Sequence, residues 1–267
     1  MSFTSDEFRF PVSNIRQDAR FGLILSWLTA FLTLLSFAMA IMTPPLSGPF
    51  CIKDCLRYPF TDSISRFPRD FYWMYPSILM MLLVVALLAV IHQTTPIARR
   101  SWSQMALSFG LLASGIVVTD YFLQLSVIQP SLLNGETDGL ALLTQYNPHG
   151  IFIALEEVGY LLLSLSLVCL APVFWSVGRL GRAVSWTSIA IFGLSLLSLV
   201  WISIAYGINR EYRFEIAVIS FAWIGLIVIS ILVALIYQRA LSKPEPGAPV
   251  VPSPTPFSSN QGKTFHA

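Results

Sequence analysis

The chain has 267 residues and a net charge of +2; 55% of its residues are hydrophobic and only 11% are charged. A soluble domain carries roughly 25% charged residues, so most of this surface must face something other than water. The sixteen Lys and Arg residues are scattered and form no patch interleaved with aromatics, which excludes nucleic-acid binding.

Six apolar stretches account for this composition. They cover residues 21–42, 73–91, 102–128, 150–177, 184–208 and 214–237. Each is about as long as the ~20 residues that an α-helix needs to cross the hydrocarbon core of a bilayer. Lipid offers the backbone no hydrogen-bond partners, so each stretch must form a helix. The sequence therefore predicts an all-α, polytopic integral membrane protein with six transmembrane helices in a bundle.

The stretches divide the chain into three parts. Residues 1–20 are predicted to be a cytoplasmic segment, residues 21–240 the transmembrane domain, and residues 241–267 a disordered, Pro-rich cytoplasmic tail. The first apolar run is longer than the 7–15 residues typical of a signal peptide, and no basic segment precedes it. We therefore expect the first helix to be retained.

The first loop between spans, residues 43–72, is long and rich in turn formers. It contains the motif Cys51-Ile-Lys-Asp-Cys55, which an oxidising compartment could bridge as a disulfide. Two free thiols are the equal alternative, whereas zinc is disfavoured because no second Cys or His pair has zinc spacing. The loop ends in Phe71-Tyr72-Trp73, an aromatic group suited to the membrane–water boundary.

Polar side chains interrupt the third and fourth spans. Asp120 and Gln124 are four residues apart and share a helix face. The fourth span contains Glu156 and Glu157, with Tyr160 on the face of Glu157. Ionisable residues within a span are costly and mark function by default. These five residues are therefore the main candidates for a site.

Depth along the helices indicates that these carboxylates meet. Asp120 precedes the end of its span at Gln129 by nine residues, about 13 Å of helix. Glu156 follows His149 by seven residues, about 10 Å. The two helices are consecutive and antiparallel, so we expect the carboxylates at nearly one level. From the last hairpin, the residues expected just above them are Tyr206, Asn209, Arg210, Arg213 and Glu215.

Three carboxylates in a low dielectric cannot all remain ionised cheaply. Either at least one is protonated, or a cation lies among them. That cation could be Arg210 or Arg213, a metal ion or a positively charged substrate. A purely structural network that locks the helices together remains the alternative.

Other small and polar residues within the spans are interpreted as packing. Ala106, Gly110 and Ser114 are four residues apart on the third span and permit close helix approach. In the second long loop, the apolar piece Leu140–Leu143 is expected to form a short helix at the membrane interface. Cys169 is interpreted as a packing residue.

The distribution of Lys and Arg predicts the orientation. An even number of spans puts both chain ends on one side. If that side is cytoplasmic, the inner segments carry ten Lys and Arg residues and the outer segments six. The positive-inside rule therefore predicts a multi-pass cell-membrane protein with both termini in the cytoplasm and the carboxylate pocket in the outer half.

Three functional hypotheses follow. The leading one is binding or carriage of a small cationic or polar solute, or of protons. Its ligand-binding residues would be Asp120, Gln124, Glu156, Glu157, Tyr160, Arg210 and Arg213. The second is a non-enzymatic membrane scaffold whose outer loops or tail contact partners. The third is a metal-assisted intramembrane enzyme, for which His149 is a weak metal candidate beside Asp120 and Glu156.

The enzyme is the least favoured of the three. The three histidines are dispersed, and no hydrolase or phosphate-binding motif occurs. We therefore assign no catalytic residue, no metal ligand and no cofactor. The expected partner is the lipid bilayer, with a small cationic or polar solute as the candidate ligand; the oligomeric state is left open.

Overall fold

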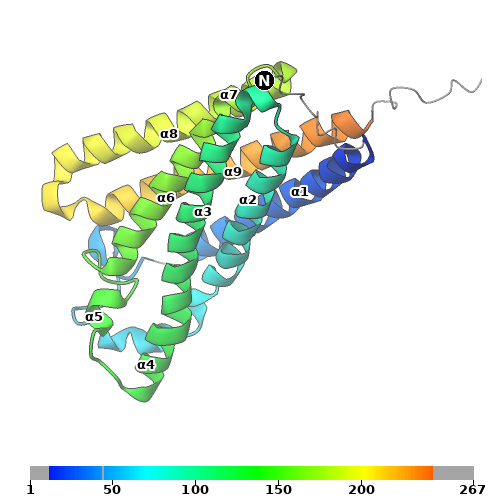
Figure 1. Cartoon of the computed structure of the whole chain (residues 1–267). Coiled ribbons are helices and arrows are strands. Elements are labelled where there is room, and N and C mark those ends of the chain that lie inside the picture. The colour runs from blue at the N-terminus through cyan, green and yellow to red at the C-terminus, as the bar shows by residue number, and fades with distance from the viewer. Residues whose placement is uncertain (1–11, 44, 243–267) are drawn as a thin grey trace, which may run out of the picture.

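The computed structural model describes residues 12–43 and 45–242, and all regular secondary structure in these residues is helical. Six helical segments are long and apolar enough to cross a membrane. The predicted fold class is therefore confirmed (Figure 1). The predictions for residues 1–11 and 243–267 lie outside the described residues.

The six long helices are α1 (Val12–Met42), α2 (Met74–Thr94), α3 (Arg100–Leu123), α6 (Ile151–Cys169), α8 (Gly178–Tyr206) and α9 (Glu211–Leu241). Helix α1 begins at Val12 rather than at Phe21, and α9 extends to Leu241. Both helices therefore extend beyond their predicted apolar spans by additional polar residues. A hydropathy pattern marks only the apolar part of a helix, so it does not predict these extensions.

Two spans are interrupted rather than uniform. The third continues from α3 through a π-helical turn, η5 (Gln124–Ile128), into α4 (Gln129–Asn134). The fourth breaks after α6 and resumes as α7 (Ala171–Phe174). Pro172 explains the second break, because it lacks an amide hydrogen and its ring clashes with the carbonyl four residues earlier.

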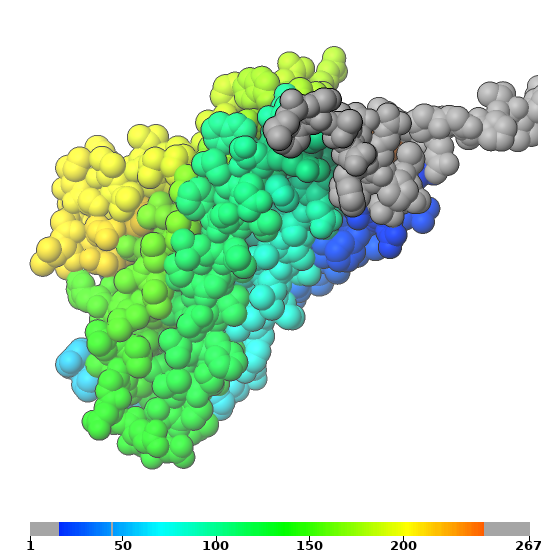
Figure 2. Space-filling view, in the orientation of Figure 1, coloured from blue at the N-terminus to red at the C-terminus, as the bar shows by residue number. Residues whose placement is uncertain are grey.

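Helix α9 holds the bundle together. It packs against α1, α6 and α8, while α3 packs between α2 and α6, and α1 lies against α2. The turn that joins α8 to α9 projects beyond the body of the molecule (Figures 1 and 2). Helix α8 is accordingly the least buried of the six long helices.

Small residues bring the helices close. Gly110 of α3 accommodates Leu88 of α2, and a Cβ atom at Gly225 of α9 would overlap Ile191 of α8. Ser114 Oγ donates to the carbonyl of Met81 at 2.7 Å, which ties α3 to α2. In a bilayer, close packing and interhelical hydrogen bonds of this kind drive helix association.

The long connections gather at one end of the bundle, which we call the loop end; α1 begins and α9 ends at the opposite, terminal end (Figure 1). The first connection contains three short helices, η1 (Gly48–Phe50), η2 (Thr61–Arg66) and η3 (Arg69–Phe71). The second contains α5 (Leu140–Leu143), at the residues where a short helix is expected. A cluster of Leu46, Phe60 and Tyr146 joins the two connections.

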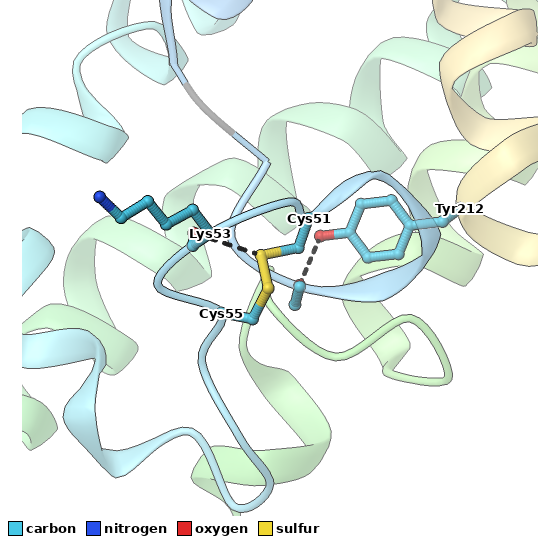
Figure 3. The surroundings of a disulfide bond; sticks show 5 residues. Cys51, Lys53, Cys55 and Tyr212 are labelled. Atoms are coloured by element: carbon cyan, nitrogen blue, oxygen red, sulfur yellow. Dashed lines mark hydrogen bonds between the residues drawn. A yellow bond between two sulfur atoms is a disulfide. The ribbon is translucent and has the colours of Figure 1, made fainter.

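A disulfide joins Cys51 and Cys55 within the first connection. Tyr212 of α9 lies beside this loop (Figure 3). Its hydroxyl is 3.1 Å from Ser47 Oγ and donates to the carbonyl of Gln145 at 3.1 Å. Gly48 has a φ of 66°, and a Cβ atom there would lie 2.9 Å from the Tyr212 ring. Only glycine meets both demands without strain.

Candidate functional site

Helices α3 and α6 bring a carboxylate and two phenols together. The Tyr121 hydroxyl on α3 donates to Glu156 Oε1 on α6 at 2.6 Å. The hydroxyls of Tyr121 and Tyr160 are 2.9 Å apart. All three side chains are completely buried. The antiparallel arrangement inferred from sequence therefore puts these groups at one level.

Helix α9 adds a further carboxylate from the side. The carboxyl groups of Glu215 and Glu156 lie within hydrogen-bonding reach of each other. A carboxylate can accept a hydrogen bond but cannot donate one. The contact is attractive only when the pair carries a proton.

Asp120 completes this side of the cluster. Its side chain is 2% exposed and interacts electrostatically with Glu156. One oxygen on each of Asp120, Glu156 and Glu215 has no hydrogen-bond partner among the described residues. Buried oxygens without donors are costly, so each site favours a proton or a cation.

Glu157 differs from the other three carboxylates. Its Oε2 lies 3.1 Å from the guanidinium of Arg210, which comes from the turn between α8 and α9. Arg210 also lies over the ring of Phe214, 5.8 Å from its centroid. Glu157 therefore has its own positive partner at the edge of the cluster.

We define the carboxylate cluster as Asp120, Glu156, Glu157 and Glu215 with Tyr121 and Tyr160. Glu215 was expected only near the site, and Tyr121 was not anticipated at all. Tyr121 is adjacent to Asp120, and a polar hydroxyl within an apolar span is the only sequence signal that it offers. Its contact with Glu156 depends on how α3 is rotated, which the apolar pattern does not fix.

Two of the predicted ligand residues lie elsewhere. Gln124 donates from Nε2 to the carbonyl of Leu143 at 2.6 Å and accepts from the amide of Gln145 at 3.1 Å, so it anchors the segment after α5. Arg213 donates to the carbonyl of Asn209 and lies over the ring of Tyr206, 4.1 Å from its centroid. Arg213 thus contacts its own turn, whereas Arg210 contacts the cluster.

His149 also lies outside the cluster. Its Nδ1 is 3.7 Å from Glu211 Oε2, in a separate groove of about 500 Å³. Residues 12–43 and 45–242 contain no group of three or more His, Cys, Asp or Glu side chains that could hold a metal ion. His149, Asp120 and Glu156 therefore do not form the hypothesised metal site.

A cavity of about 320 Å³ adjoins the cluster at the loop end. Glu215 lines it, and so do Trp73 and Tyr212. The complete lining is Phe37, Ala40, Ile41, Thr43, Pro45, Leu46, Trp73, Gln145, Tyr146, Tyr212, Glu215, Ile216, Ile219, Ser220 and Trp223. The cavity thus lies between the loop-end turns of α1 and α9, beneath the two connections. Its walls are largely aromatic and apolar, and Glu215 is its only carboxylate.

The aromatic group Phe71-Tyr72-Trp73, predicted for the membrane–water boundary, divides between the interior and the surface. Phe71 and Trp73 are buried, with 0% and 8% exposed surface, whereas Tyr72 is 49% exposed. The Trp73 ring packs edge-on against Tyr121, with centroids 5.0 Å apart, and lies 6.2 Å from Trp223. Trp73 directly precedes α2 and lies beneath the folded connection, which shields it from solvent. The hydropathy of the loop could not indicate this cover.

Six apolar helices and an extensive lipid-facing surface define a multi-pass membrane protein that contacts the lipid bilayer. Comparison of the chain with protein-family models, with curated proteins and with solved structures finds no match.

Proposed function

We propose that this protein binds a small cationic or polar solute, or protons, at the carboxylate cluster, as a carrier or receptor in a cell membrane does. One observation carries the proposal. Asp120, Glu156 and Glu215 are at least nine-tenths buried and converge, and no Lys or Arg among the described residues forms an ion pair with them.

Electrostatics gives this observation its functional meaning. Neighbouring carboxylates in a low dielectric repel one another strongly unless protons or a cation reduce their charge. Intramembrane acidic residues are expensive to maintain and line ion or proton pathways in many membrane proteins. Among the described residues, Arg210 is the one cationic side chain that forms an ion pair with the cluster, and it pairs with Glu157. The other three carboxyl groups are left to bind exchangeable charge.

The phenols have a positioning role in this proposal. Tyr121 donates to Glu156 and fixes the direction of its carboxyl group. Tyr160 supports Tyr121 and packs against Trp223, with ring centroids 6.0 Å apart. The carboxyl groups are thereby held in place before a cation arrives.

The proposed orientation has both chain ends in the cytoplasm, from the ten-to-six bias of Lys and Arg. Glu156 and Glu215 each lie near the loop-end start of their helices, α6 and α9. In this orientation the cluster lies in the outer half of the membrane and receives its solute from the outside.

Charge-neutralising variants test the proposal. Glu156→Gln and Glu215→Gln keep the shape of the side chain but remove a proton-binding group. In the parent protein, deprotonation adds repulsion, so we expect the unfolding midpoint in detergent to fall as pH rises from 5 to 9. Both variants should respond less to pH because one repelling charge is gone.

Glu136→Gln is the control, because Glu136 is an exposed carboxylate of the second connection and is outside the cluster. It should keep the pH response of the parent. A parent protein whose unfolding midpoint responds neither to pH nor to any cation contradicts the proposal.

A scaffold role is the second candidate, and one observation favours it. The Tyr121–Glu156 bond and the Glu157–Arg210 ion pair tie α3, α6 and the α8–α9 turn together. If these contacts are only structural, no cation or polar solute should raise the unfolding midpoint of the parent. A solute-dependent rise that Glu156→Gln or Glu215→Gln removes separates the two functions.

A further inference from the structure

We propose that the cavity between α1 and α9 is a site for an organic ammonium ion, with Glu215 as its counterion. This inference rests on the proposed function, because Glu215 belongs to the carboxylate cluster. It goes further by naming the class of solute and the place where the solute binds. Neither the aromatic lining nor the cavity was evident from the sequence.

Glu215 is the first reason for this assignment. Its side chain is 8% exposed, it lines the cavity, and no Lys or Arg among the described residues forms an ion pair with it. A buried carboxylate without a positive partner is costly. An ammonium group within the cavity would supply the missing positive charge.

The aromatic walls are the second reason. Trp73, Tyr212 and Trp223 contribute rings to the cavity, together with Phe37 and Tyr146. Aromatic rings attract cations through their negative faces, and aromatic surroundings are how proteins bind quaternary ammonium groups. A hydrated metal ion gains nothing from these walls, whereas an organic cation buries its carbon surface against them.

Size is the third reason. A volume of about 320 Å³ lies at the lower end of the roughly 300–1,000 Å³ range of small-molecule sites. It suits an ammonium ion with one ring or a short alkyl chain. Larger drug-like molecules would require the connections at the loop end to move.

Binding at Glu215 has a consequence for protons. The charged and titratable groups around Glu215 and its cavity are Asp120 from α3, Glu156 and Glu157 from α6, Tyr212 from α9 itself, and Tyr146 from the second connection. Helix α1 contributes no titratable residue to the cavity. A bound cation favours the ionised form of Glu215. A proton held between Glu215 and Glu156 would then be released, so we expect affinity to decrease as pH falls.

The test uses benzyltrimethylammonium, because its charge does not depend on pH. Binding to the purified full-length protein in detergent is followed by tryptophan fluorescence, since Trp73 and Trp223 line the cavity, and by the unfolding midpoint. We expect saturable binding with release of up to about one proton, measured in weakly buffered solution. The neutral isostere neopentylbenzene and the anion benzoate should bind at least about tenfold more weakly.

Two variants and one control complete the test. Glu215→Gln should weaken benzyltrimethylammonium binding by roughly 30-fold or more, the scale expected when a buried charge loses its partner. Ala40→Phe fills the cavity from α1 without altering a carboxylate and should also abolish binding. Glu136→Gln, at an exposed carboxylate outside the cluster, should bind like the parent.

The outcomes separate this inference from the proposed function. If the unfolding midpoint depends on pH through Glu156 and Glu215 but benzyltrimethylammonium does not bind, the ammonium site is overturned and proton binding stands. If binding occurs equally in Glu215→Gln and in the parent, Glu215 is not the counterion and the inference fails. If neither pH nor any cation has an effect, both proposals fail.

Discussion

Tyr146, in the second long connection, forms a hydrogen bond to Asp70 in the first. Its hydroxyl donates to Asp70 Oδ2 at 3.2 Å, while Arg69 donates to Asp70 Oδ1 at 3.0 Å. Burial, and then the negative charge of Asp70, raise the pKa of the Tyr146 hydroxyl. The phenol therefore remains a donor at any physiological pH.

Replacing Tyr146 with Phe should destabilise the protein by about 1–3 kcal/mol, because it leaves a buried oxygen of Asp70 without its donor. The pH dependence follows from the sign of the shift. Since the pKa is raised in the folded state, the stability that it contributes is present below the unfolded-state pKa of about 10 and is lost above it. Unfolding by denaturant at pH 8 and at pH 10.5 measures this. A Tyr146→Phe variant with the same alkaline loss as the parent contradicts it.

For single residues, the sequence predicts the positions of the acidic side chains better than it predicts their interaction partners. Asp120, Glu156 and Glu157 could be placed at one depth because helix rise converts residue number into height. The hydrogen-bond partner of Glu156 could not be predicted, because its contact with Tyr121 depends on how the helix is rotated about its axis. Arg210 contacts the cluster, whereas Arg213 contacts its own turn. This difference depends on the backbone path of the short α8–α9 turn, which has no periodic sequence pattern.

Among the elements, the loop containing the Cys51–Cys55 disulfide packs against α9. Ser47 and Gly48 contact Tyr212, which lies one turn before Glu215 and lines the same cavity. The disulfide limits the freedom of the segment that follows these contacts. It thereby helps to keep the cover of the cavity in place.

Replacing Cys51 and Cys55 together with Ser should lower stability by about 2 kcal/mol, the loop-closure entropy expected for so short a loop. We also expect faster quenching of Trp73 fluorescence by acrylamide, because the cover over the cavity is looser. The same comparison after mild reduction of the parent is the control. Unchanged stability and unchanged quenching would show that the loop is held by its packing alone.

The elements also show where sequence patterns are insufficient. Length and hydropathy predict the six spans because lipid imposes helix on every long apolar stretch. The break at Pro172 and the π-helical turn at Gln124 are not visible in hydropathy, since both preserve an apolar surface. The short helix at Leu140–Leu143 was predictable, because its apolar residues stand alone within a polar loop.

For the whole molecule, orientation decides from which side of the membrane the proposed site would receive a solute. With cytoplasmic termini, the loop end faces outward. We predict that Cys introduced at Glu136 reacts with a membrane-impermeant thiol reagent added to intact cells, whereas Cys introduced at Ser176 reacts only after the membrane is permeabilised. Both are placed in a Cys51→Ser/Cys55→Ser background, where the remaining Cys169 is buried. The reverse pattern of labelling would place the termini outside and the cluster in the inner half.

Helices α8 and α9, with 29 and 31 residues, are about 44 and 46 Å long, well beyond a hydrocarbon core of roughly 30 Å. Helices longer than the core adapt to bilayer thickness by tilting. Glu215 is part of this hairpin, whereas Glu156 lies on α6 and Asp120 on α3. A change in membrane thickness that tilts the hairpin would therefore alter the spacing of the acids, and with it the affinity of the proposed site for a proton or a cation.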